Sequence, residues 1–126
     1  MRRLWWAGWL SLGFGVALAG SAAAAGDPVA GQPLYERYCA ACHGIKGRGN
    51  GPAAAALRPR PIDMSEPVWQ RGVSDDYLRR IIRDGGTAVG RSPQMAPWGF
   101  ALNERQLEDV VAYLRALARE EVETPQ

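Results

Sequence analysis

In this sequence, the side chains best suited to chemistry lie in one short stretch, YCAACHG, residues 38–44. Cys39 and Cys42 are three positions apart, His43 follows directly, and the sequence contains no other cysteine or histidine. A thiolate is a nucleophile and a metal ligand, and imidazole is the commonest metal ligand in proteins. The trio therefore indicates thiol redox chemistry, a metal site, or covalent capture of a cofactor whose metal the histidine binds.

Each interpretation makes a different demand on the rest of the sequence. A structural disulfide between Cys39 and Cys42 would close a very small loop, which stabilises little. Thiol oxidoreductases carry CxxC beside a βαβ pattern, which is absent here. Zinc usually takes four ligands, whereas the sequence has only three cysteine and histidine residues in total. CAACH does match the attachment signature of c-type haem. On a helix both thiols would lie on one side and reach one edge of the macrocycle, with His43 as ligand to the iron.

Residues 1–25 are predicted to be a signal peptide. Arg2 and Arg3 precede 22 uncharged residues, 4–25, which end in small residues typical of a cleavage site. We expect cleavage after Ala25 and export to the periplasm; an uncleaved membrane anchor is the less favoured alternative, because this stretch is just long enough to cross a bilayer. Residues 26–126 then form one domain with 13 basic and 13 acidic side chains. Its net charge is therefore zero, which gives no reason to expect binding to nucleic acid.

The hydrophobic pattern of the mature chain predicts an all-α domain. The first expected helix runs from Asp27–Pro28, or from Pro33, to Cys42. The second covers residues 74–84, with Ser74 as its cap. The third covers residues 102–120, with Asn103 and Gln106 as a capping box. The segments 44–64 and 86–102 are rich in glycine and proline and unusually long for loops of a compact domain. Short helices bury little apolar surface, so we expect a non-protein group at the centre.

From about Asp27 to Glu120 the chain resembles a small monohaem cytochrome c of class I. The resemblance rests on CAACH, the GNGP loop, SPQMAPWG and the terminal LEDVVAYLRAL. It implies the class I cytochrome c fold, in which three main helices and long loops surround one covalently bound haem c. It also implies thioether bonds from Cys39 and Cys42 and places His43 as an axial ligand of the iron.

The sixth iron ligand has two candidates, Met64 and Met95, once Met1 is removed with the signal peptide. The resemblance favours Met95, because SPQMAPWG matches the segment from which the family supplies its axial methionine. It also assigns the carbonyl of Pro52 as acceptor for the second ring nitrogen of His43, a bond that fixes the orientation of an axial imidazole.

Several further features of the family map onto this sequence. Donors to the haem propionates are expected among Arg58, Arg60, Arg91, Trp69 and Trp98. The contact between the first and last helices maps onto Gly31, Tyr35 and Tyr113, although Pro33 departs from the pattern. The lysine-rich docking faces of some relatives have no counterpart, because Lys46 is the only lysine, so the composition identifies no partner by charge.

An iron with both axial positions filled has no site for substrate, so the sequence predicts an electron-transfer protein and not an enzyme. Methionine sulfur raises the potential of the iron relative to two histidines. The resemblance suggests a terminal oxidase, a quinol–cytochrome reductase or a periplasmic dehydrogenase as redox partner, with membrane contact only if the leader stays uncleaved. The alternative is a haem enzyme or gas sensor in which the sixth ligand is labile.

Overall fold

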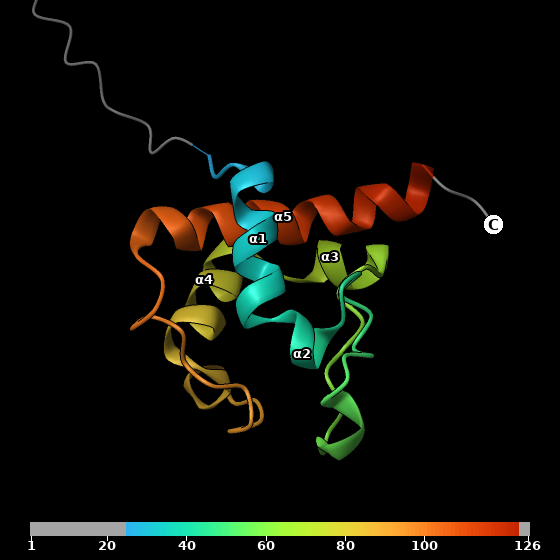
Figure 1. The fold of residues 1–126 in the computed structure, drawn as a ribbon, viewed down its shortest axis with the longest axis vertical. Helices are drawn as coiled ribbons and strands as arrows, with labels where there is room; N and C mark the ends of the chain where they lie inside the picture. The colour runs from blue at the N-terminus through green and yellow to red at the C-terminus, as the bar shows by residue number, and fades with distance from the viewer. Residues whose placement is uncertain (1–24, 124–126) are drawn as a thin grey trace, which may run out of the picture.

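Helices and 3₁₀ turns are the regular structure of residues 25–123, the range that the computed structural model describes (Figure 1). In chain order the elements are α1 (Pro28–Tyr38), α2 (Ala40–His43), η1 (Ala54–Ala56), α3 (Pro67–Gly72), α4 (Asp75–Asp84), η2 (Gly86–Val89) and α5 (Glu104–Glu123), where η denotes a 3₁₀ turn. The predicted all-α fold is confirmed for this range. The predicted signal peptide lies outside it, apart from Ala25.

The first helix begins at Pro28 and continues through Pro33, so the prediction of a start at Pro33 is wrong. Asp27 caps it by accepting a hydrogen bond from the Val29 amide at 2.9 Å, and Pro28 occupies the first turn. A proline inside a helix leaves the carbonyl four residues earlier without its usual donor. That residue is Val29, which is 79% exposed, so water can bond the freed carbonyl. The proline is therefore tolerated.

The helix does not continue unbroken to Cys42, as the sequence had suggested. Cys39 interrupts it with a φ of −118°, and α2 starts again at Ala40. The Cys39 amide still donates to the Tyr35 carbonyl at 2.8 Å, and the Cys39 carbonyl accepts from the His43 amide at 2.9 Å. The break is thus a bend that keeps hydrogen bonds on both sides and turns α2 away from α1.

Caps at the other helices follow the local sequence. Ser74 Oγ accepts from the Tyr77 amide at 3.1 Å and starts α4. Asn103 and Gln106 exchange two hydrogen bonds, 2.9 and 3.0 Å long, which is the predicted capping box of α5. The short helix α3 was not predicted, although Pro67 at its first turn is a typical start signal.

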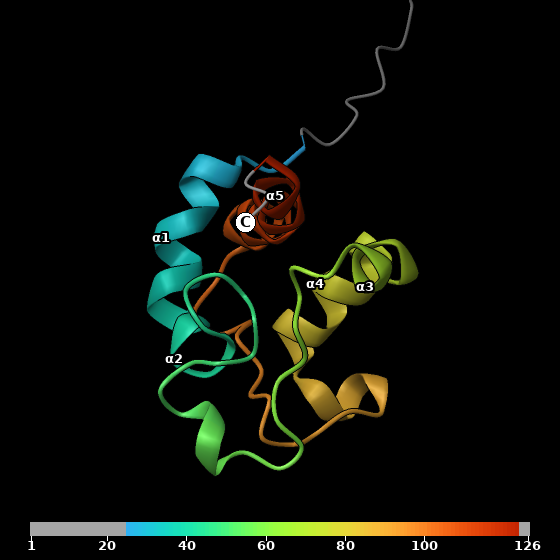
Figure 2. The same cartoon turned by 90° about the vertical axis from the view of Figure 1, so that its right-hand side faces the viewer.

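The two ends of the domain meet where α1 crosses α5 (Figures 1 and 2). Gly31 is buried at the crossing, and a Cβ atom there would lie 2.5 Å from the Asp109 carbonyl carbon and 3.0 Å from Tyr113 Cβ. Only glycine allows so close an approach of the two backbones. Tyr35 packs on Tyr113 with ring centroids 5.2 Å apart. The helix contact implied by the resemblance is therefore confirmed, despite Pro33.

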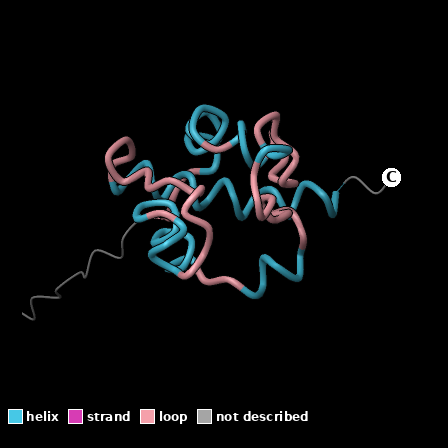
Figure 3. The backbone as a smooth tube through the Cα atoms, turned by 90° about the horizontal axis from the view of Figure 1, so that it is seen from below, coloured by secondary structure: helices cyan, strands magenta, loops and turns pink. Residues whose placement is uncertain are grey.

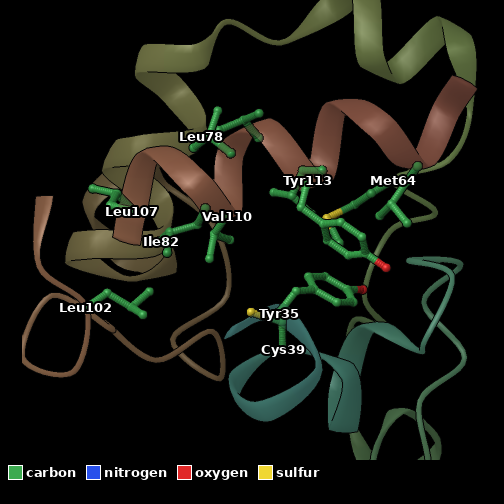
Figure 4. Close-up of a cluster of buried hydrophobic side chains, with 12 residues drawn as sticks. Tyr35, Cys39, Met64, Leu78, Ile82, Leu102, Leu107, Val110 and Tyr113 are labelled. Atoms are coloured by element: carbon green, nitrogen blue, oxygen red, sulfur yellow. The ribbon is translucent and has the colours of Figure 1, made fainter. Parts of the chain in front are cut away.

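The core lies between α5 and the elements packed beneath it. Its buried members are Tyr35, Cys39, Met64, Leu78, Ile82, Leu102, Leu107, Val110, Val111, Tyr113, Leu114 and Leu117. Figure 4 shows Tyr35 of α1 and Cys39, which follows α1, facing the side of α5 that carries Val110 and Tyr113. Leu78 and Ile82 bring α4 to the same cluster. Helix α5 thus covers this cluster from one side, and the loops lie on the other side.

The loops connect these helices over long, irregular paths (Figure 3). The segment after α2 folds back on it, because the Ala53 amide donates to the Ala41 carbonyl at 2.9 Å. It then passes Gly47, whose carbonyl accepts from the Met64 amide at 2.7 Å. Among the described helices, none is long and apolar enough to cross a membrane. Between α2 and α5 the chain thus consists of loops and of helices that are shorter than α5.

Candidate functional site

A cavity of about 260 Å³ lies beneath the core, between the α1–α2 segment and α4. Voids in packed protein interiors seldom exceed a water molecule, whereas ligand pockets start at roughly 300 Å³. Leucine, isoleucine and valine side chains of α4 and α5 form its apolar wall: Leu78, Ile81, Ile82, Val110 and Leu114. Cys39, Cys42, His43 and Met95 all line this one space. The structure therefore brings together the residues singled out for chemistry.

The two cysteines enter the cavity from the bend between α1 and α2. They form no disulfide, and Cys39 is only 8% exposed. Burial, with a smaller contribution from the neighbouring Cys42, raises the pKa of Cys39 to about 12. A thiol oxidoreductase needs an accessible thiolate, and here the buried thiol stays protonated at neutral pH. Cys39 is thus poorly suited to act as the attacking thiolate.

His43 ends α2 and also faces the cavity. Its backbone is fixed on both sides, because its amide donates to Cys39 and its carbonyl accepts from the Gly49 amide at 2.8 Å. Burial lowers the pKa of the imidazole, which favours the neutral form that binds metals. Within residues 25–123 the His43 Nδ1 atom is buried without a hydrogen-bond partner. A buried orphan nitrogen of this kind needs an explanation.

The predicted acceptor for His43, the Pro52 carbonyl, is held close to α2. On either side of Pro52, the Gly51 amide donates to the Cys42 carbonyl at 3.2 Å and the Ala53 amide donates to Ala41. A Cβ atom at Gly51 would lie 2.5 Å from the Ala40 carbonyl oxygen, so only glycine lets the loop approach. The bond from His43 to Pro52 is absent from this structure and stays a prediction.

Met95 reaches the cavity from the loop that follows η2. Its carbonyl accepts from the Gly86 amide at 2.9 Å, and its amide donates to the Ser92 carbonyl at 3.2 Å. These bonds fix the backbone of Met95 to η2. Met64 lines the same cavity but is buried in the core, where it packs beside Tyr113 (Figure 4). Met64 therefore contributes to the packing of the core.

Four of the five predicted donors to the propionates line the cavity: Arg60, Arg91, Trp69 and Trp98. Arg58 does not line it; its guanidinium donates to the carbonyls of Ala55 and Leu57 at 2.9 and 2.7 Å. Polar lining residues that the sequence did not reveal are Tyr77, Ser92 and Gln94. The last two precede Met95 in SPQM, and their closeness to that residue in the sequence was the available signal.

The residues present fit a haem. The cavity is large and apolar, a neutral imidazole and a thioether reach it from different segments, and two thiols lie next to that imidazole. Among residues 25–123 no three His, Cys, Asp or Glu side chains are grouped to hold a bare metal ion. The site thus matches a cofactor that brings its own metal and its own apolar body.

Comparison with known sequences points in the same direction. The sequence profile of the family described as cytochrome C oxidase, cbb3-type, subunit III matches residues 26–114. Cytochrome c-554(547) of Halothiobacillus neapolitanus is 30% identical over 95 residues, which cover 74% of this chain and 99% of that protein. The range matched by the family profile includes Cys39, Cys42, His43 and Met95.

Two solved structures share the fold, each with a TM-score of 0.57. One is KustC0563, a c-type cytochrome that is 23% identical, over 69% of this chain and 95% of the solved one. The other belongs to the Kuenenia stuttgartiensis reducing HAO-like protein complex Kustc0457/Kustc0458 and is 27% identical over 77% of this chain. This chain covers only 44% of that larger protein, so the likeness concerns one part of it.

Proposed function

This chain belongs to the c-type cytochrome family, whose fold implies electron transfer, and on that premise we propose a periplasmic carrier of single electrons with one haem c. In this proposal Cys39 and Cys42 hold the haem through thioether bonds, and His43 and Met95 ligate its iron. The observation that carries the proposal is the convergence of all four side chains on one apolar cavity. Haem c, when bound, supplies the iron that takes up and releases one electron.

The chain's own residues have two tasks in this function. The first is to exclude water, which the apolar side chains of α4 and α5 do by covering one wall of the cavity. The second is to keep both ligands in place. His43 ends a helix with bonded backbone on both sides, and Met95 is tied to η2 by the Gly86 amide. Ligands positioned in advance need little rearrangement when the charge at the site changes.

A fixed Met95 favours the carrier over the alternative of an enzyme or gas sensor with a labile ligand. A labile ligand would sit on a loop with few bonds to the scaffold, since local stability follows local bonding. Backbone hydrogen bonds instead hold the Met95 loop at several points. The amides of Gly86 and Arg91 donate to the carbonyls of Met95 and Gly86, respectively. The amides of Met95 and Trp98 donate to the carbonyls of Ser92 and Ile82, respectively. These bonds support the proposal that Met95 is a fixed sixth ligand.

The partners proposed are redox proteins. The matching family is described as an oxidase subunit, and one structural relative belongs to a multiprotein complex. A terminal oxidase, a quinol–cytochrome reductase and a periplasmic dehydrogenase remain the proposed classes. Encounters of this kind bury small, transient interfaces.

The test is spectroscopic, on protein expressed with haem-attachment machinery. Intact mass and titration of free thiols measure whether one haem is joined to both cysteines. The oxidised protein should show the weak far-red charge-transfer band from sulfur to iron, and Met95→Ala should remove it. The matched variant Met64→Ala should keep the band, because this methionine serves the core. Free thiols in the mature protein, or a band that survives in Met95→Ala, would contradict the proposal. Ready binding of carbon monoxide to the reduced wild-type protein would favour the sensor.

A further inference from the structure

The short helix α2 is too small to fix its own position. It has four residues, Ala40–His43, and no side chain caps its start. A single helical turn orders several backbone angles in return for very few hydrogen bonds, so it is not stable alone. The chain leaves α2 at Gly44 with φ 82° and ψ 158°, a combination that is essentially restricted to glycine. The place of His43, the last residue of α2, therefore depends on contacts from other parts of the chain.

Tyr35 of α1 forms hydrogen bonds at both ends of this segment. Its carbonyl accepts from the Cys39 amide at 2.8 Å, directly before α2. Its hydroxyl donates to the Gly44 carbonyl at 2.7 Å, directly after α2. Gly44 is buried, and its carbonyl also accepts from the Gly47 amide at 3.0 Å. Both lone pairs of this buried carbonyl thus have a donor, and one of the two donors is a side chain.

The ring of Tyr35 is fixed by the crossing of α1 and α5. Tyr35 is fully buried, and its ring packs on Tyr113 of α5 with centroids 5.2 Å apart. This packing needs only an aromatic ring, which phenylalanine would also supply. A hydroxyl that is removed from water costs free energy unless it is hydrogen-bonded. The phenol oxygen therefore adds a requirement that the ring alone does not make, because it specifies where the Gly44 carbonyl must lie.

We propose that Tyr35 is a positioning residue for His43: its hydroxyl fixes the end of α2 through the Gly44 carbonyl and so sets the orientation of the imidazole toward the iron. This inference rests on the proposed function. The other backbone bonds here are local, since the Gly44 amide donates to the Ala40 carbonyl and the His43 carbonyl accepts from the Gly49 amide. Tyr35 instead connects this segment to α5, the longest described helix. A ligand held by such a scaffold rearranges little when the charge of the iron changes.

The test is proton NMR of the oxidised holoprotein, because the hyperfine shifts of axial imidazole protons and of haem methyl groups depend on the orientation of the imidazole plane. Tyr35→Phe keeps the packed ring and removes the hydroxyl, so the resonances of His43 and of the haem methyl groups should shift. The matched control is Tyr38→Phe, which removes the same group near the end of α1, outside the cavity lining, and should leave them in place. In the reduced protein the methyl resonance of Met95 should stay constant in both variants, because η2 holds that residue.

Thermal unfolding of the same samples separates positioning from a purely stabilising role. A lower Tm for Tyr35→Phe with unchanged His43 resonances would overturn the proposal, because the hydroxyl would then stabilise the fold without orienting the ligand. Equal shifts in Tyr35→Phe and Tyr38→Phe would also overturn it, since the effect would not belong to the bond with Gly44. The wild-type protein tests the proposed function separately. A wild type without attached haem, or without the far-red band, would refute the carrier with Met95 as ligand before any tyrosine variant is compared.

Discussion

Replacing Gly31 with alanine tests the closest contact in the fold. An added Cβ would lie 2.5 Å from the Asp109 carbonyl carbon, so α1 and α5 must separate by about 1 Å to restore ordinary contact. The obstacle is backbone, which cannot rotate away as a side chain can. Overpacking of this kind costs up to about 3 kcal/mol, against a gain of ~0.5–1 kcal/mol for alanine within a helix. We therefore expect Gly31→Ala to destabilise the domain by about 2 kcal/mol.

The measurement is thermal unfolding of the oxidised holoprotein, followed by circular dichroism. About 2 kcal/mol corresponds to a fall in Tm of roughly 8–16 °C for a domain of this size. The matched control is Gly72→Ala, at the end of α3, where an added Cβ meets nothing within 4 Å. Helix propensity alone predicts that both variants gain stability. A lower Tm for Gly31→Ala together with a higher Tm for Gly72→Ala would support the crossing geometry. An unchanged or higher Tm for Gly31→Ala would show that the helices do not meet at this glycine.

Two further predictions concern a buried phenol and a helix cap. Burial, then the charges of Cys39 and Tyr113, raises the pKa of Tyr35 above its ordinary value, and its hydroxyl donates to the Gly44 carbonyl at 2.7 Å. As the pH rises, the unfolded chain therefore loses this proton before the folded chain does. The free energy of unfolding should then fall above about pH 10, by up to ~1.4 kcal/mol per pH unit. Urea titrations should show a shallower fall for Tyr35→Phe than for the control Tyr77→Phe. Asn103→Ala removes one bond of the capping box and should cost about 1 kcal/mol in the same titration, whereas an unchanged midpoint would mean that α5 does not depend on its cap.

Local sequence signals were sufficient for the helix caps. Ser74 and Asn103 each accept a hydrogen bond from an amide three residues away, so the residues needed to recognise the caps are close together in the sequence. The start of α1 was ambiguous for the opposite reason. Whether Pro33 is tolerated depends on whether the Val29 carbonyl can reach water, and that exposure is set by packing against α5.

The site was predictable as a set of residues but not as a surface. CAACH identifies three of its members by spacing alone. The loops that complete the cavity have no periodicity, so only the family resemblance, and no local pattern, placed Arg60 and Arg91 at one site.

The burial of Cys39 has a consequence for the order in which this protein matures. Cys39 belongs to the same buried cluster as Val110 and Leu114, and its sulfur is shielded once α5 is in place. If thioether bonds form as proposed, they form more readily while α5 is undocked, because α5 does not yet bury the thiol. The docking of α5 therefore limits access to this thiol, and a chain in which α5 docks early should take up its cofactor more slowly.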